Sequence, residues 1–436
     1  MLADKQITRR DFLKGAAAAV AGPYVVAASS LGAGAQPAPS ERIVMGCIGV
    51  GGQGTGVMRG FLGNSDVQVV AICDVFENKR ESVKRALERH YAAQLRKGTY
   101  KGCATYNDFR ELLAREDIDA VLIATPDHWH VLQGIAAARA GKDMYIEKPL
   151  SLNIAEGRAL HDAVRRYGRV FQFGTQQRSD HEFRFACELV RNGRIGKLHT
   201  IKVGSPASGE RAIEPPMPVP KGLDYDMWLG PAPWAPYTEN RCRTHLWYFM
   251  SDYTMGFISG WGVHHVDIAQ WGNDADMTTP IEFEGEGVFP KDGPCDTATA
   301  WEVECKYANG VKMIFADNRK LDQGVRFEGT EGWVFVRRGA IDANPKSLLK
   351  EVIGPNEVHL GENTNHCRNF LDCVKSRKDP VSPIHAAHHS NSICQLSDIA
   401  IRTKRKLRWD PDRERFINDP HANRSLARAM RSPWRL

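Results

Sequence analysis

Residues 42–63 contain an apolar strand, a turn rich in glycine and the start of a helix, and this order restricts the fold more than any other feature. Gly49, Gly51 and Gly54 form a G-x-G-x-x-G pattern, and the next apolar strand ends in Asp74, twenty residues beyond Gly54. Such glycines let the backbone approach a pyrophosphate at the N-terminus of the following helix, while an acid at this distance binds the ribose hydroxyls. The pattern predicts a dinucleotide-binding α/β unit.

Strands and helices continue to alternate as far as residue 168. We expect a helix from near Asn107, a strand at residues 119–125 and a helix that ends at Gly141. This alternation predicts a doubly wound parallel sheet with right-handed crossovers over residues 42–168.

Three polar groups come directly after strands: the glycine turn, the segment ATPDHWH at residues 124–130, and Glu147-Lys148-Pro149. Pro149 cannot continue a strand ladder, and it restricts the backbone of Lys148 before it. Because ligands bind at the carboxyl ends of the strands in such sheets, we expect the three groups to line one cleft.

The acid at position 74 also bears on the choice of dinucleotide. A carboxylate at Asp74 would repel an additional 2′-phosphate, which favours NAD over NADP. Lys79 and Arg80 lie close by in the sequence and leave NADP as the second option.

The amino-terminal region has the features of an export signal. Arg9 and Arg10 precede an apolar stretch, and residues 33–35 form an A-x-A cleavage site. We therefore expect a twin-arginine signal peptide at residues 1–35, the twin-arginine export machinery as a partner, and a periplasmic or otherwise exported protein. A stable membrane anchor is not expected, because Gly22 and Pro23 interrupt the stretch well short of the roughly 20 apolar residues that a span needs.

Composition is that of a soluble globular protein: 436 residues are enough for two domains, with 42% hydrophobic and 25% charged residues. The ten cysteines show no C-x-x-C pair, and Cys47 and Cys73 fall inside apolar strands, so we expect buried thiols and no metal site.

The second half of the chain reads as a separate α/β domain over residues 169–400, followed by a basic tail at residues 401–436. Residues from about Trp301 to Phe335 alternate polar and apolar side chains, which predicts antiparallel strands. From residue 402 onward there are 11 Lys or Arg and 4 Asp or Glu, a net charge of +7 that exceeds the +6 of the whole chain. The tail has no helical stripe or aromatic ladder, so we do not expect it to bind nucleic acid.

The glycine turn with Asp74, the TPDHWH segment, the Glu-Lys-Pro and a later histidine-rich helix together resemble the Gfo/Idh/MocA oxidoreductases. The resemblance implies a Rossmann domain and an α/β domain with an open, mainly antiparallel sheet that covers the nicotinamide. It implies that Lys148 touches both nicotinamide and substrate, and that His130 lies near the cofactor. The expected cofactor-binding residues are Gly49, Gly51, Gly52, Gln53, Gly54, Asp74, Thr125, Pro126, His130, Glu147 and Lys148.

Taking a hydride from an alcohol carbon requires a base for the hydroxyl proton. Burial beside a positively charged nicotinamide would lower the pKa of Lys148 towards neutral pH. His264 is the expected partner in proton transfer, although this family usually has an aspartate where Gly260 stands. Its orienting carboxylate must then come from elsewhere, with Asp252 and Asp267 as candidates. Glu147 is expected to orient Lys148 or the cofactor amide.

Aromatic faces and bidentate polar groups suit the apolar faces and hydroxyl edges of sugar rings. The expected substrate contacts are Gln176, Arg178, Arg243, Trp247, Tyr248, Tyr253 and His265. A metal site formed by His264 and His265 lacks a third ligand and is not expected.

Export adds one constraint, because free NAD should be scarce outside the cytoplasm. We therefore expect an enzyme that oxidises a sugar or sugar-derivative hydroxyl with a tightly retained NAD. The alternatives are an NAD-cycling glycosidase or lyase that cleaves a glycosidic bond through transient oxidation, and a non-catalytic carbohydrate-binding relative. We also expect a homo-oligomer, through an exposed face of the second sheet.

Overall fold

The amino-terminal sheet is parallel and has six strands, in the order β3-β2-β1-β4-β5-β6. Its strands are β1 Ile43–Ile48, β2 Val67–Cys73, β3 Ala104–Tyr106, β4 Ala120–Ile123, β5 Asp143–Ile146 and β6 Phe171–Phe173. Most of β1 and all of β4 and β5 are buried, as expected for strands covered by helices on both faces. The doubly wound parallel sheet predicted from the sequence is confirmed.

Helices connect these strands, and two of the helices begin at a residue whose side chain caps the helix. They are α2 Gly52–Leu62, α3 Glu77–His90, α4 Ala92–Arg96, α5 Phe109–Leu113, α6 His130–Arg139 and α7 Ile154–Arg166. The side chain of Asn153 accepts the Glu156 amide at the start of α7 at 3.0 Å, and Asp108 accepts the Arg110 amide at the start of α5. Each cap satisfies an amide that has no partner within its helix.

The second sheet has nine strands in the order β13-β12-β11-β7-β10-β9-β8-β14-β15. These are β7 Leu198–Ser205, β8 Glu282–Val288, β9 Ala300–Lys306, β10 Lys312–Asp317, β11 Gly324–Gly329, β12 Trp333–Arg337, β13 Ala340–Asn344, β14 Leu407–Asp410 and β15 Arg415–Phe416. All its pairs are antiparallel except β7 with β10. The predicted open, mainly antiparallel sheet is therefore confirmed, including the antiparallel pair at residues 300–317.

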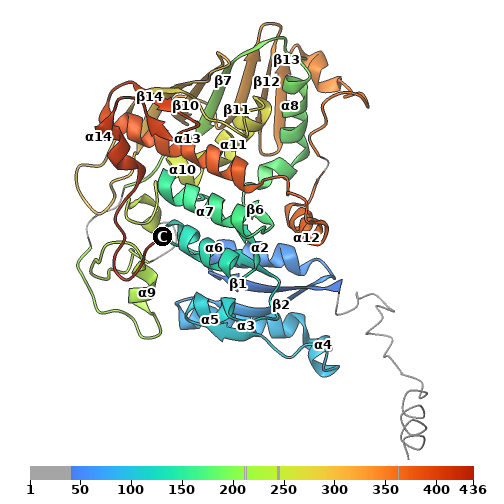
Figure 1. Cartoon of the computed structure of the whole chain (residues 1–436), viewed down its shortest axis with the longest axis vertical. Coiled ribbons are helices and arrows are strands. Elements are labelled where there is room, and N and C mark those ends of the chain that lie inside the picture. The colour runs from blue at the N-terminus through green and yellow to red at the C-terminus, as the bar shows by residue number, and fades with distance from the viewer. Residues whose placement is uncertain (1–40, 211, 213, 243–245, 362) are drawn as a thin grey trace, which may run out of the picture. The chain divides into compact units, whose positions relative to one another are not determined.

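Three helices pack against this sheet: α8 His181–Arg191, α11 Gly262–Gly272 and α13 Ile384–Thr403. α13 also contacts α7, so it joins the large sheet to the parallel-sheet layer (Figure 1). α12 His366–Ser376 contacts α2. Several positions of the large sheet carry Lys–Glu ion pairs, for example Lys312 Nζ with Glu304 Oε2 at 2.9 Å. The homo-oligomer expected through an exposed face of this sheet stays a prediction.

The computed structural model describes residues 41–210, 212, 214–242, 246–361 and 363–436. All the elements named here belong to the unit Ile43–Leu436. The expected signal peptide and Arg243 lie outside the described residues. Within the described residues, no helix has both the length and the apolar character required to cross a bilayer. All ten cysteines are free thiols, nine of them buried.

The carboxyl-terminal residues pack onto the rest of the unit. β14 pairs with β8 in the large sheet, and the Arg431 amide donates to the Pro231 carbonyl at 2.9 Å. The rings of Trp434 and Trp129 lie edge to face with centroids 4.7 Å apart. The boundaries expected at residues 168 and 400 stay predictions.

Candidate active site

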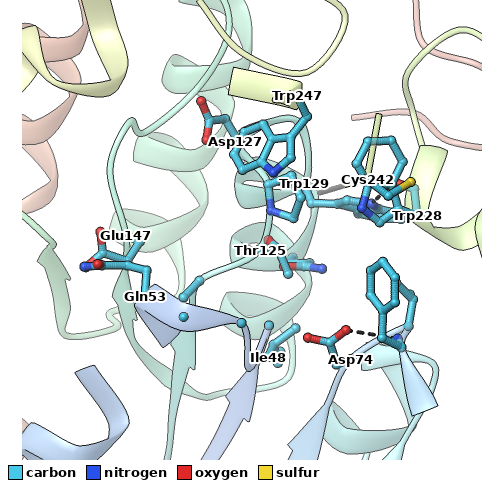
Figure 2. Close-up of a pocket in the computed structure, with 18 of the residues that line it drawn as sticks. Ile48, Gln53, Asp74, Thr125, Asp127, Trp129, Glu147, Trp228, Cys242 and Trp247 are labelled. Carbon is cyan, nitrogen blue, oxygen red and sulfur yellow. Dashed lines mark hydrogen bonds between the residues drawn. The ribbon is translucent and has the colours of Figure 1, made fainter. Parts of the chain in front are cut away.

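A cavity of about 520 Å³ lies at the carboxyl ends of β1, β2, β4 and β5. This is within the range of about 300–1,000 Å³ that is typical of small-molecule sites. The three polar groups that follow these strands all contribute to its wall, as expected, and residues 227–261 of the second half close it. In Figure 2, Asp74 lies at one end of the view, and Asp127 and Trp247 lie at the other.

The glycine turn has the geometry that close approach of a diphosphate requires. Gly49 has a φ of +82°, and a Cβ there would lie 2.6 Å from the backbone of Ala124. A Cβ on Gly54 would lie 2.0 Å from the Gly49 carbonyl oxygen, so the helix packs directly on the turn. Gly51 and Gly52 face open space, and the first turn of α2 contains no acid and no side-chain cap. The amides at this helix end are thus available to an anion, and the turn fits a dinucleotide.

Asp74 completes the nucleotide end of the cavity. Its carboxylate oxygens accept the amides of Val50 at 2.9 Å and Phe76 at 3.0 Å, which ties the end of β2 to the glycine turn. The Lys79 ammonium lies 3.9 Å from the centre of the Phe76 ring. The Arg80 guanidinium donates to the Asp74 carbonyl and to Asn107 Oδ1, so it is held by partners within the fold.

Glu147 joins three elements around the cavity. Its Oε1 accepts Gln53 Nε2 from α2 and Gln176 Nε2, both at 3.1 Å. Gln53 and Glu147 point toward one another in Figure 2. Gln176, expected at the substrate, instead helps to fix Glu147 and also donates to the Tyr145 hydroxyl at 2.9 Å.

Lys148 follows Glu147 at the cavity wall, where its Nζ donates to the Tyr248 hydroxyl at 3.0 Å. Burial by itself would lower the pKa of Lys148, but Tyr248, Glu147 and Asp127 outweigh burial, and the pKa lies above its ordinary value. Burial also raises the pKa of Tyr248, with Lys148 opposing that shift. The pair is therefore an ammonium and a neutral phenol at neutral pH. A lowered pKa of Lys148 was expected beside a charged nicotinamide, whereas the protein groups alone raise the pKa of this lysine.

Asp127 is a cavity residue that was absent from the expected set, although it lies inside the TPDHWH segment. Its side chain is buried, and its Oδ2 has no hydrogen-bond partner among the described residues. Burial raises the pKa of this carboxyl to about 7, against a smaller opposing effect of Thr254. A buried carboxyl in the wall of a cavity is a candidate for chemistry or binding.

Several other wall residues that were not predicted from the sequence are aromatic. Trp129, Trp228 and Trp261 line the cavity together with the expected Trp247 and Tyr248. Trp129 belongs to the quoted TPDHWH segment, whereas Trp228 lies in the short helix α9 Tyr225–Leu229, for which no motif gave a signal. The Trp129 indole donates to the Met227 carbonyl at 3.1 Å and so holds α9 against this segment.

Several expected site residues lie outside the cavity wall. His130 is buried, and its Nδ1 and Nε2 lie 2.7 Å from the Pro149 carbonyl and 2.9 Å from the Thr125 carbonyl. It therefore connects two of the strand-end turns. His265 is held by the Gly204 carbonyl, 2.7 Å from its Nδ1.

The histidine and acids expected to act with Lys148 also lie outside the wall. His264 is buried, and burial, then Lys148 and Arg338, hold its pKa well below the ordinary value. Asp267, a candidate for the orienting carboxylate, is paired with Arg178, which was expected at the substrate. Asp252 is half-buried, and burial raises its pKa.

The aromatic segment at residues 246–253 divides in two. Trp247 and Tyr248 face the cavity, whereas Tyr253 is fully buried and its hydroxyl accepts Arg241 Nη1 at 2.9 Å. No three His, Cys, Asp or Glu side chains gather as a metal site in the part of the chain that the structure describes.

Comparisons with known families agree with this geometry. Residues 43–175 match the Gfo/Idh/MocA model for an oxidoreductase family with an NAD-binding Rossmann fold, and residues 203–436 match the model for a C-terminal alpha/beta domain of that family. Residues 6–23 match the signal sequence of the twin-arginine translocation pathway. The chain is therefore exported by that pathway.

Individual relatives include enzymes of two kinds. Myo-inositol 2-dehydrogenase of Thermotoga maritima is 31% identical over 302 residues, which cover 67% of this chain and 74% of the relative. Alpha-N-acetylgalactosaminidase of Shewanella oneidensis is 34% identical over 212 residues, which cover 44% of each chain. The WlbA dehydrogenase of Bordetella pertussis, solved with NADH and UDP-GlcNAcA, shares the fold at a TM-score of 0.63 and 14% identity, covering 85% of this chain and 99% of its own.

Proposed function

Because the chain belongs to the Gfo/Idh/MocA oxidoreductase family, we propose that it is an exported enzyme that moves a hydride between NAD and a sugar or sugar-derivative hydroxyl. One observation carries the proposal. The Lys148 ammonium lines the same cavity as the glycine turn, Asp74 and aromatic residues of the second half.

The dinucleotide would be held by the amides of the glycine turn at its diphosphate and by Asp74 at its ribose. When bound, it supplies the acceptor or donor of the hydride. NAD is favoured over NADP, because the Asp74 carboxylate lines the nucleotide end and Arg80 is held by Asn107 and a backbone carbonyl. Of the two cations near Asp74 in the sequence, Lys79 lines the cavity and Arg80 does not.

The carbohydrate would lie between Lys148 and the aromatic wall. Trp129, Trp247 and Trp261 offer flat apolar surfaces, which suit the C–H faces of a sugar or an inositol ring. Asp127 supplies an acceptor for hydroxyl groups from the same wall. The Lys148 ammonium would donate a hydrogen bond to the reacting oxygen and stabilise negative charge that forms on it.

Export supports a tightly held cofactor. The twin-arginine route carries proteins that are already folded, so a dinucleotide bound in the cytoplasm would leave with the protein. Glu147 connects Gln53 at the glycine turn to Gln176 beyond β6, which fixes the two sides of the nicotinamide end relative to one another. A retained cofactor must be re-oxidised in place, by a second substrate or by the product of the first step.

The second of these routes gives a second candidate function. Oxidation beside a glycosidic position acidifies a neighbouring C–H and permits elimination, so that reduction afterwards leaves a cleaved bond and no net redox change. The similarity to alpha-N-acetylgalactosaminidase over 44% of each chain favours this candidate. A non-catalytic carbohydrate-binding protein is the third reading.

Purified protein distinguishes these functions. Candidate sugars and glycosides are added while the absorbance of reduced nicotinamide is recorded, and the products are then analysed for a cleaved glycosidic bond. We expect hydride transfer with at least one cyclic polyol, and cleavage would support the second candidate. Bound dinucleotide with no nicotinamide signal for any sugar would contradict both enzymes and support the binding protein.

Replacing Lys148 with Met should reduce hydride transfer by at least about 100-fold, the size of effect expected for a group that stabilises developing charge, while NAD stays bound. Lys202→Met is the matched control, because its ammonium pairs with Glu328 at 3.0 Å in the large sheet, away from the cavity. Undiminished turnover of Lys148→Met would remove this lysine from the mechanism.

A further inference from the structure

The geometry points to Tyr248 as the group that exchanges a proton with the reacting substrate oxygen, with Lys148 as its charge partner and Gly260 as the residue that makes room for it. The inference rests on the proposed function and extends it. Tyr248 then takes the proton-transfer role that the sequence led us to expect of His264.

The first support is the contact itself. Lys148 Nζ donates to the Tyr248 hydroxyl at 3.0 Å, across 100 positions of sequence, and both side chains line the cavity. The Tyr248 side chain is half-buried in the cavity wall, and its hydroxyl has the Lys148 ammonium as a fixed neighbour. Burial raises the pKa of Tyr248, and the Lys148 ammonium opposes that shift because its positive charge stabilises the phenolate.

The second support is the space at position 260. A Cβ on Gly260 would lie 2.5 Å from Tyr248 Cε1, closer than any side chain tolerates. Only glycine therefore allows the ring to occupy its present place beside Lys148. Glycine in place of the aspartate at position 260 therefore leaves the space that the Tyr248 ring occupies.

The third support is the position of the competing groups. His264 and Asp252 are not among the residues that line the cavity, and Asp267 is engaged by the Arg178 guanidinium. Asp127 lines the cavity, but no hydrogen bond connects it to Lys148 among the described residues. Tyr248 is thus the exchangeable group in direct contact with the lysine.

In the reducing direction, Tyr248 is the proton donor. The carbonyl carbon takes a hydride from a reduced nicotinamide dinucleotide, the C=O π bond breaks, and the oxygen takes the proton of the Tyr248 hydroxyl. A C–H bond and an alcohol O–H bond form, and the phenolate that remains is stabilised by the Lys148 ammonium. In the oxidising direction the Tyr248 phenol first releases its proton to solvent, and the phenolate beside the Lys148 ammonium then accepts the substrate hydroxyl proton as the hydride leaves.

The main test is Tyr248→Phe in the purified protein, which removes one hydroxyl and keeps the ring. Proton transfer by a positioned side chain contributes about 100- to 10,000-fold, so we expect hydride transfer to fall by at least about 100-fold while the affinity for NAD changes little. Tyr225→Phe is the matched control, because its hydroxyl bonds to the Ala235 carbonyl at 2.8 Å outside the cavity wall. Gly260→Ala should displace the Tyr248 ring and cause a similar loss.

A second measurement does not depend on turnover. The ultraviolet band of ionised tyrosine is titrated in the wild type and in Tyr248→Phe, so that the difference isolates one of the 11 tyrosines. We expect Lys148→Met to move this ionisation to higher pH. Circular dichroism and thermal unfolding show whether each variant is folded.

The role of Tyr248 would be overturned if Tyr248→Phe transferred hydride within about threefold of the wild-type rate. It would also be overturned if Asp127→Asn lost hydride transfer while Tyr248→Phe kept it. An ionisation of Tyr248 that Lys148→Met leaves unmoved would overturn it too. A wild-type protein with no hydride transfer at all would overturn the proposed function as well. An active wild type with an active Tyr248→Phe would overturn only this inference.

Discussion

The guanidinium of Arg178 and the carboxylate of Asp267 form a paired hydrogen bond, with Nε to Oδ2 at 2.7 Å and Nη2 to Oδ1 at 2.8 Å. Asp276 accepts from the same guanidinium at 2.7 Å, and Ser390 donates to Asp267. The Arg178 and Asp267 side chains are 1% and 0% exposed. This buried network joins the segment after β6 to α11 and α13, so its role is to position the second half against the parallel sheet.

We therefore predict that Arg178→Met destabilises the protein instead of weakening substrate binding. Removing one partner leaves buried carboxylates without compensation, which costs about 3–5 kcal/mol of unfolding free energy. Urea unfolding measures this change. Arg110→Met is the control, because its pair with Asp108 has an arginine that is 59% exposed, and we expect a loss of less than about 1 kcal/mol. A stable Arg178→Met protein with a raised KM would restore the substrate contact expected from the sequence.

Asp127 predicts a pH dependence of stability. Its pKa is about 7 in the folded protein against an ordinary value of 3.8, so between these pH values the folded state keeps a proton that the unfolded state has lost. The stabilisation is present below about pH 4 and is lost as the pH rises to about 7. At 1.36 kcal/mol per pKa unit, the wild type should lose up to about 4 kcal/mol relative to Asp127→Asn over this range.

Urea unfolding at pH 4.5, 6 and 8 tests the prediction through the difference between the two proteins. Asp117→Asn serves as the control, because Asp117 is 58% exposed beside Arg115 and should leave the pH profile nearly unchanged. Parallel profiles for the wild type and Asp127→Asn would show that Asp127 is ionised and solvated in the folded state.

The sequence predicted best where the signal is local. The glycine turn, the Asp74 spacing and the helix that ends at Gly141 depend on neighbours within a turn or a strand, and the structure reproduces the elements that they mark. The order of the strands in the parallel sheet then brings the three groups at the strand ends to one cavity.

The polar partners within the site were not predictable in this way. The Lys148–Tyr248 and Arg178–Asp267 contacts join residues 100 and 89 positions apart, and no periodicity specifies them. The state of Asp127 depends on burial and on a missing partner, which are properties of the folded surroundings. Residue type identified candidates for the site, but packing decided which of them face the cavity.

The glycine turn allows a comparison within one helix. Gly54→Ala would place a Cβ 2.0 Å from the Gly49 carbonyl, whereas Gly56→Ala meets nothing within 4 Å. We expect Gly54→Ala to lose NAD binding and to unfold more easily. Gly56→Ala should gain about 0.5–1 kcal/mol, because alanine loses less backbone entropy in a helix. Calorimetric NAD titration and urea unfolding measure both effects, and a Gly54→Ala protein that binds NAD normally would contradict the proposed position of the diphosphate.

Asp74 should decide which dinucleotide binds. Hydrogen bonds to a charged group contribute about 1.5–3 kcal/mol, so Asp74→Asn should weaken NAD binding about 10- to 100-fold. NADP binding should improve or stay the same, because the carboxylate that repels a 2′-phosphate is gone. Asp119→Asn is the matched control, since Asp119 likewise accepts a backbone amide, that of Val44 in β1 at 2.8 Å, and does not line the cavity. Titration of protein stripped of its dinucleotide measures both affinities, and an unchanged ratio of NAD to NADP affinity would place the ribose away from Asp74.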